Sequence, residues 1–422
     1  MFFLYTLVRY HGMKLDRIIK IVLVLIVAEL CVGGGGRFIA FGPVSFRMVL
    51  FAIAMILTVV ALFYKDRRAL IRREYGTLLM FFVLVILIGL ATGLTHGAQL
   101  VFWKEDVKPL SYFLILPFFL LAIRNADDIR IISRIVMVSA LIIAIVFFVA
   151  LALIYSNTIP FLTFYKLTLG TEELFFRGEY TFFYKGFLYL GIGIVFGFFL
   201  LKKPVNYILI AVLSLALLLS LTRGMMLAIS LTFCIYFFFS RSVRKMILTV
   251  LVSVIVLFKG ATVIRELSLW LAANQNFLLT HIPSVRRSSD ILLGDRSYSD
   301  SQRMLQIKEV MGSTSFSSSW IGHGFGIGVP DRPVHMEISY LEIFHKQGVI
   351  GLAFWCVLFW MLWVRYERVS ERPEAKAFFF SAVFIFLQSV TNQYINNPIG
   401  LSMLLLALVC LDRMNKPITA HD

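Results

Sequence analysis

Long apolar runs, separated by shorter polar turns, extend along almost the whole chain. Many approach or exceed the roughly 18 residues that cross the hydrocarbon core of a bilayer. About twelve such runs can be placed, with centres near residues 27, 54, 86, 116, 145, 191, 214, 232, 255, 357, 384 and 405. The pattern predicts an all-α polytopic membrane protein, with residues 1–422 forming a single integral membrane domain.

Composition and charge agree with this class. The chain is 59% hydrophobic and 15% charged, whereas soluble domains carry about 25% charged residues. Lys and Arg concentrate in alternate turns, such as "KDRRALIRRE", "IRNADDIRIISR", "SRSVRK" and "DRMNK". Because basic residues favour the cytoplasmic side of a membrane, this alternation predicts a multi-pass protein with both termini in the cytoplasm. The first apolar segment is expected to remain as an anchor, since no cleavage site follows it.

One predicted external segment, residues 265–347, is much longer than the other turns. It contains the glycine run "GHGFGIG" and ends in "HMEISYLEIFHKQGVIG", which holds several titratable residues directly before an apolar run. We expect helices within it, because "DSQRMLQIKEVM" has amphipathic spacing and Asp300 or Ser301 can cap such a helix. Long segments in compact proteins are usually functional, so this one is predicted to carry part of the active site.

Arginines gather in the later segments predicted to lie outside, where the positive-inside rule disfavours them. They are Arg177, Arg223, Arg265, Arg286, Arg287, Arg296, Arg303 and Arg332. Salt bridges within one long segment are one explanation. The other is an anionic ligand on the outer face.

Three of these arginines are candidate ligand contacts. Arg223 lies where one predicted span ends and the next begins, Arg303 lies on the amphipathic helix, and Arg177 lies among aromatic residues. Each also has a structural interpretation: an interface anchor for Arg223, a solvated face for Arg303, and pairing with Glu173 or Glu179 for Arg177.

His335 is the candidate general base. A helix can begin near it after Pro333, and the positive end of the helix dipole favours a neutral imidazole that can accept a proton. Gly348 is expected to mark the start of the membrane span. On such a helix His345 lies about a hundred degrees away from His335, so it is not expected to take part. A structural role is the alternative for a lone histidine.

The sequence lacks the motifs of several other kinds of catalytic or nucleotide-binding site. There is no Walker-type loop, HExxH, DxD or GxSxG, and the first predicted outside loop, "GGGGRFIAFGP", has no carboxylate. The four cysteines lie in or beside apolar runs without paired spacing. We therefore expect no cofactor, no metal and no nucleic-acid partner.

Three motifs together resemble the bacterial O-antigen ligase and O-antigen polymerase family. They are "LTRGMMLAI", then "SQRMLQI" with "SSSWIGHGFGIG", then "HMEISYLEIFHKQGVIGL", in order over about residues 170–365. The resemblance implies that Arg223, Arg303 and, with a weaker match, Arg177 hold the donor diphosphate. It also implies that His335 is the base.

The sequence departs from the family's motif at one position. Met336 follows His335, where the family has Asn or Ser. Glu337 or Ser339 would then orient the histidine.

The expected function is glycosyl transfer at the outer face of the bacterial inner membrane, without a metal and with inversion. The donor would be an undecaprenyl-diphosphate-linked oligosaccharide, and membrane lipids would surround the enzyme. The acceptor would be a second lipid-linked glycan, as for a polymerase, or lipid A-core, as for a ligase; the polymerase is slightly favoured.

A transporter or flippase for lipid-linked glycans is the rival from another class. It predicts charges along a path through the spans, whereas Glu29 and Lys259 are the main charges there. A purely structural role is a third alternative, against which the long charged segment argues.

Overall fold

The computed structural model describes residues 2–37, 40–41, 44–63, 72–156, 158–171, 173–176, 181–254 and 288–415. In this part the chain is helical apart from two short antiparallel hairpins, which confirms the predicted all-α class. The first hairpin pairs β1 (Ala40–Phe41) with β2 (Val44–Ser45), and the second pairs β3 (Leu174–Phe176) with β4 (Phe182–Tyr184).

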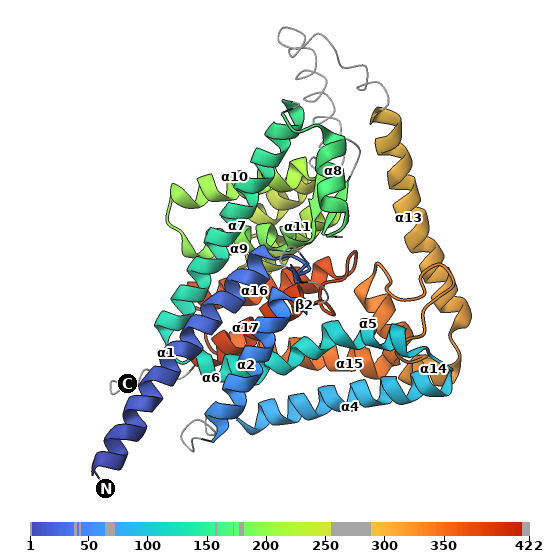
Figure 1. Cartoon of the computed structure of the whole chain (residues 1–422). Coiled ribbons are helices and arrows are strands. Elements are labelled where there is room, and N and C mark those ends of the chain that lie inside the picture. Colours follow the sequence, from blue (N-terminus) through green and yellow to red (C-terminus); the bar gives the residue numbers. More distant parts are fainter. Residues whose placement is uncertain are drawn as a thin grey trace.

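The helices follow the apolar runs of the sequence (Figure 1). Every predicted span centre that falls on described residues lies in a helix; the centre near residue 255 lies outside them. The helices are α1 Phe2–Val32, α2 Phe46–Leu62, α4 Arg73–Thr95, α5 Leu100–Ser111, η1 Tyr112–Ile115, α6 Leu116–Ala122, α7 Ala126–Tyr155, α8 Phe161–Leu169, η2 Lys185–Phe187, α9 Leu188–Leu200, α10 Val205–Leu219, α11 Arg223–Phe239, α13 Ser288–Ser313, α14 Phe316–Ile321, α15 Ser339–Glu367, α16 Pro373–Gln388 and α17 Pro398–Met414.

Three of the described helices, α4, α7 and α15, are long and apolar enough to cross a membrane. Other apolar helices are shorter, including α2, α10 and α11. Length alone therefore identifies fewer spans than the sequence predicts, and the count of about twelve remains a prediction.

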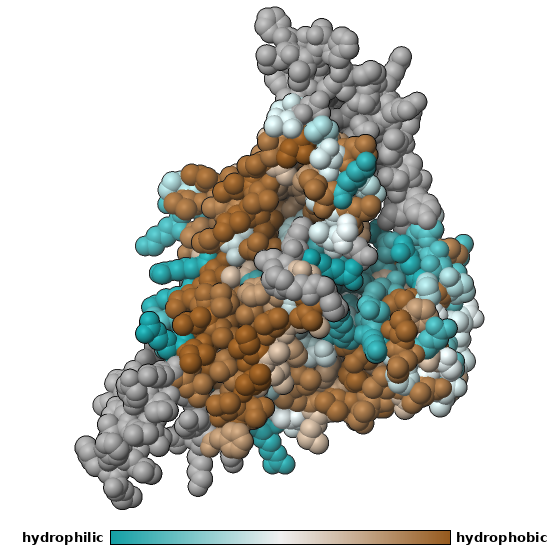
Figure 2. Space-filling view, viewed as in Figure 1, coloured by the Kyte–Doolittle hydropathy of each residue, from teal (hydrophilic) through white to brown (hydrophobic). Residues whose placement is uncertain are grey.

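The core forms around α9, α16 and α17. Every residue of α17 after its first, Pro398, is buried, and α16 packs against α9, α11 and α17. These helices are apolar around their whole circumference, which is the pattern of a helix enclosed by other helices. The outer helices instead expose apolar side chains, such as Leu84 and Leu87 on α4, and much of the surface in Figure 2 is hydrophobic. Such a surface suits lipid as the solvent.

Ion pairs join three segments that the sequence assigns to the cytoplasmic side. Arg365, near the end of α15, lies 2.6 Å from the Glu74 carboxylate and 3.6 Å from Asp412. Arg72, just before α4, lies 2.8 Å from Asp412 near the end of α17. These contacts bring the start of α4 and the ends of α15 and α17 together at one end of the bundle. The membrane side of that end remains a prediction.

The glycine run at residues 33–36 holds an internal carboxylate. The backbone nitrogens of Gly35 and Arg37 donate to the two oxygens of Glu173, at 2.6 and 3.0 Å. Gly34 adopts φ +54°, a conformation that favours glycine. This contact joins the end of α1 to the β3–β4 hairpin. Glu173, one of the two suggested partners of Arg177, therefore accepts hydrogen bonds from this glycine run. Arg177 itself lies outside the described residues.

Two predicted helix starts in the long segment are wrong. The amphipathic helix is α13, which begins at Ser288 and not at Asp300 or Ser301. The helix expected near His335 is α15, which begins at Ser339 with Ile338 as its N-cap. The preceding chain is held in a turn, because Val329 and Arg332 exchange two backbone hydrogen bonds, at 3.0 and 2.9 Å. His335 therefore precedes the helix, and the helix-dipole argument does not apply to it.

Gly348, where the sequence predicts the membrane span to begin, interrupts α15. Its φ of +63° is non-helical, so two helical parts meet there at a kink. A side chain at this position would also overlap the Trp320 backbone at the end of α14. The part of α15 before Gly348 carries Glu342, His345 and Lys346.

Candidate functional site

The glycine run "GHGFGIG" binds to α4 through its backbone. The Phe325 nitrogen donates to the Gly89 oxygen at 2.8 Å, and a Cβ at Gly324 would overlap the Gly93 nitrogen. Gly324 also has φ +92°. Only glycine suits this close approach, so the run fixes the long segment against α4.

The substitution Gly324→Ala is expected to destabilise the protein by roughly 2–5 kcal/mol, since it adds both a steric overlap and backbone strain. Thermal unfolding of the purified protein in detergent measures the effect. The matched control is Gly312→Ala on α13, where an added Cβ meets no other atom within 4 Å. Equal melting temperatures for the two variants would contradict this view of the motif.

A buried ammonium joins two carboxylates beside the glycine run. Lys346 Nζ lies 2.6 Å from Asp106 Oδ1 and 2.7 Å from Glu342 Oε1, and it also donates to the Val334 oxygen. The Gly326 nitrogen donates to the other Asp106 oxygen at 2.8 Å. Burial raises the pKa of the Asp106 carboxyl on α5, and the Lys346 ammonium opposes that rise. Each charge in this cluster has a direct partner, as burial requires.

His335 borders this cluster. Its Nδ1 lies 3.4 Å from Glu342 Oε1 and 3.9 Å from Asp106 Oδ1, and its side chain is 41% exposed. We assign the hydrogen of this contact to Nδ1, which donates to Glu342, because a carboxylate accepts and does not donate. Nε2 is then the ring nitrogen able to accept a proton from a ligand.

The connection between α16 and α17, residues 389–397, holds Glu342 from the other side. The Gln393 and Asn396 amides donate to Glu342 Oε2 at 2.6 and 2.8 Å. Ser339 donates to the Asn392 oxygen at 2.9 Å and lies 3.0 Å from Asn396 Oδ1. Ser339, one of the two predicted orienting residues, thus holds residues 389–397 in place. The residue in contact with His335 is Glu342.

The same connection contacts the start of α11, where Arg223 is the first helical residue. A Cβ at Gly224 would lie 2.6 Å from Thr391 Oγ1, so Gly224 packs closely against the Thr391 side chain. The Arg223 side chain is exposed and makes no ion pair within the described part of the chain. Residues 389–397 therefore touch both the Arg223 end of α11 and the Glu342 contact of His335.

The other predicted orienting residue, Glu337, pairs with arginines. Arg303 Nε lies 3.0 Å from Glu337 Oε2, and Arg332 lies 3.2 Å from Oε1. The Glu337 nitrogen also donates to Gln306 on α13 at 3.1 Å. These contacts bring Arg303 to the segment that carries His335. Toward α5 and the lower part of α13, Figure 2 shows a broad group of hydrophilic side chains beside the apolar surface.

Two arginines cannot be placed in the site. Arg177 lies outside the described residues, and the side chain of Arg296 on α13 does as well. Their contribution remains a prediction.

Among the described residues, Asp106, His335 and Glu342 could offer ligand atoms to a metal, all within 4.8 Å of one another. The Lys346 ammonium, however, lies 2.6 and 2.7 Å from the two carboxylates. A divalent ion there would be placed against a cation. The residues fit an internal ammonium better than a metal.

His345 is packed inside the protein. Its ring stacks on His323 with centroids 4.4 Å apart, and its backbone oxygen accepts from the His323 nitrogen at 2.7 Å. The side chain is 2% exposed. This burial gives His345 a structural position, whereas His335 is open to a ligand.

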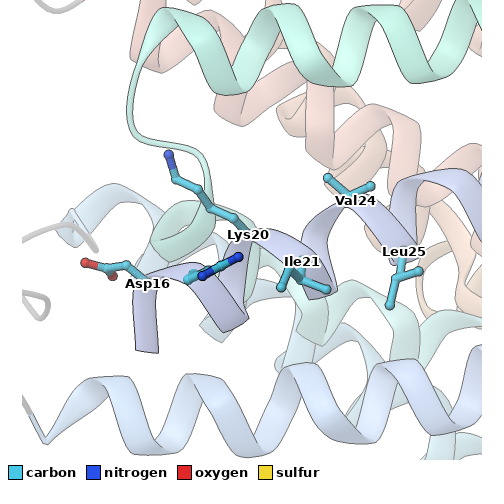
Figure 3. A pocket seen from close by; sticks show the side chains of 6 residues that line it. Asp16, Lys20, Ile21, Val24 and Leu25 are labelled. Carbon is cyan, nitrogen blue, oxygen red and sulfur yellow. The ribbon is translucent and has the colours of Figure 1, made fainter. Parts of the chain in front are cut away.

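A hollow on the outer surface of α1 is separate from these residues (Figure 3). It is lined by Asp16, Arg17, Lys20, Ile21, Val24 and Leu25. Lys20 pairs with Asp128 at 2.9 Å, and Asp16 pairs with Arg124 at 2.7 Å. No predicted site residue lines this hollow.

Sequence reasoning missed Asp106, Lys346 and residues 389–397 as parts of the site. Lys346 had a local signal, since Glu342 and Lys346 are four residues apart on one helix and can pair. Asp106 had none, because its partner Lys346 is 240 residues further along the chain.

Comparison with known proteins supports the family that the motifs resemble. The chain is 24% identical over 391 residues to the O-antigen polymerase of Shigella flexneri, and the match covers 92% of this chain and 93% of that protein. No family model matches the chain. The similarity supports the O-antigen polymerase and ligase family, but not a specific member of it.

Proposed function

We propose that the protein is a membrane glycosyltransferase that joins a lipid-diphosphate-linked oligosaccharide to a glycan acceptor on the periplasmic face. The observation that carries the proposal is the position of His335. Its side chain is open to a ligand, and its Nδ1 lies 3.4 Å from Glu342 Oε1. The packing of Gly224 against Thr391 and the Arg303–Glu337 ion pair support the assignment of Arg223 and Arg303 to this site. The similarity to an O-antigen polymerase along 92% of the chain supports it.

The proposed reaction is a single displacement. His335 Nε2 takes the proton of the acceptor hydroxyl, whose oxygen attacks the anomeric carbon of the donor sugar. The bond from that carbon to the phosphate oxygen breaks, and its electron pair leaves with the lipid diphosphate. Attack opposite the leaving group inverts the anomeric configuration. Glu342 then stabilises the imidazolium.

The arginines stabilise the charge of the leaving group. A guanidinium presents a planar pair of donors that matches two phosphate oxygens. Arg223 and Arg303 are proposed to take this role, with Arg177 as a third contact. Undecaprenyl diphosphate is the proposed lipid carrier.

We propose a second lipid-linked glycan as the acceptor, since the relative is named a polymerase. Transfer to lipid A-core, as by a ligase, is the alternative. Assays of the purified protein with each acceptor separate the two, because only the preferred acceptor gives a lengthened glycan.

Metal independence is a testable part of the proposal. Turnover is expected to persist in excess EDTA, because the arginines replace a metal at the diphosphate and Lys346 lies between the two carboxylates. The measurement is release of lipid diphosphate by purified protein, with and without chelator. Loss of turnover in EDTA that magnesium or manganese restores would assign charge stabilisation to a metal.

The rival interpretation, a transporter, receives little support from the charges within the bundle. Glu29 on α1 is 2.7 Å from Arg47 on α2, which also donates to the Gly34 oxygen at 2.7 Å. A carboxylate that is neutralised by an internal arginine in this way has a structural role. Lys259 lies outside the described residues.

A further inference from the structure

We infer that Lys346 and Asp106 are positioning residues that set the charge around Glu342 and, through it, the proton affinity of His335. The inference rests on the proposed function. Lys346 is itself no candidate for substrate contact, since its side chain is 2% exposed and its three hydrogen bonds go to Asp106, Glu342 and Val334.

The cluster has a defined charge. Asp106 and Glu342 each contribute one negative charge, and Lys346 contributes one positive charge, so one negative charge remains beside His335. That single charge matches the one positive charge that His335 gains when it takes a proton. The other charged groups near this segment form their own ion pairs: Arg303 and Arg332 both pair with Glu337, and Arg332 also lies 3.8 Å from Asp331.

The geometry of the cluster is fixed independently of Lys346. Asp106 Oδ2 accepts from the Gly326 nitrogen at 2.8 Å. Glu342 Oε2 accepts from Gln393 and Asn396 at 2.6 and 2.8 Å. The oxygens that face His335 are Asp106 Oδ1 and Glu342 Oε1, and both are bonded to Lys346. Lys346 therefore offsets part of the negative charge on the two oxygens that the histidine faces.

Removal of either member should change the proton affinity of His335 in opposite directions. Lys346→Met leaves two carboxylates without a counter-charge, which favours the protonated imidazole. Asp106→Asn leaves Lys346 to balance Glu342 alone, which favours the neutral ring. The double variant Asp106→Asn with Lys346→Met returns the cluster to one negative charge.

The experiment is the pH dependence of turnover for the wild-type protein and these three variants, purified in detergent. The acid limb of the profile should move up by about one pH unit in Lys346→Met and down by a similar amount in Asp106→Asn. The double variant should return the limb to near its wild-type position. KM for the donor should change little, because the arginines proposed to hold the diphosphate are untouched.

Each outcome decides the matter. The cluster would have a structural role only if the acid limb of the pH profile is unchanged in both single variants. The same conclusion would follow if the double variant only multiplies the two losses of turnover and its acid limb does not return to the wild-type position. If Lys346→Met does not fold, as judged by thermal unfolding, the direction of the shift in Asp106→Asn decides alone. Wild-type protein without transfer, or an active His335→Ala variant, would instead overturn the proposed function.

Discussion

The variant His335→Ala is expected to lower turnover of the lipid-linked donor by about 10²–10⁴-fold, the usual contribution of a general base. The acceptor hydroxyl would lose the group that takes its proton. Donor binding should change little, because a base acts on the transition state more than on the ground state. The measurements are turnover by purified protein and, separately, binding of the donor.

Two other histidines provide controls. His96, which is exposed at the end of α4, can be replaced by alanine with turnover close to wild type. His345→Ala removes a buried ring stacked on His323, so it should lower the melting temperature while the folded fraction remains active. Equal losses of activity in His335→Ala and His96→Ala, or a His335→Ala variant that simply fails to fold, would leave His335 a structural residue.

The variant Arg223→Lys is expected to lower turnover by roughly 10²-fold although it keeps the charge, because an ammonium does not reproduce a bidentate phosphate contact. Arg303→Lys should behave in the same way. The assay is release of lipid diphosphate by the purified variants. The matched control is Arg130→Lys, whose side chain is 61% exposed and pairs with Asp127 on its own helix; it should be close to wild type.

The arginine hypothesis has a clear contrary result. Near-normal turnover in both Arg223→Ala and Arg303→Ala would show that neither holds the diphosphate. In that case the pairing of Arg303 with Glu337, at 3.0 Å, would be its whole role.

The hydrophobic pattern was sufficient to predict the helical class and the positions of most helices. The reason is that each helix must be apolar wherever it contacts lipid or the protein core. The number of spans remains a prediction. Helices α16 and α17 are as apolar as a span, yet they are 16 and 17 residues long and buried. A run of apolar residues does not distinguish lipid from protein as its surroundings.

The candidate site could be predicted only where local sequence determines it. Gly348 is expected to mark a change along the chain, and the structure has a kink in α15 at that residue. The start of α15 could not be predicted, since contacts of residues 329–337 with one another and with α13 delay it to Ser339. Glu337 and Ser339 are predicted as orienting residues because Met336 replaces the family's Asn or Ser, and that local comparison does not reach Glu342, seven residues after His335.

The central claim is that a lipid-diphosphate-linked glycan is the donor and that its glycosidic bond is broken. The direct test is to reconstitute the purified protein in vesicles with lipid-linked oligosaccharide and to measure glycan products and lipid diphosphate together. The account predicts a lengthened glycan and one lipid diphosphate released for each transfer, with both products lost in His335→Ala. Movement of intact donor across the bilayer, without release of lipid diphosphate, would contradict the account and identify a transporter.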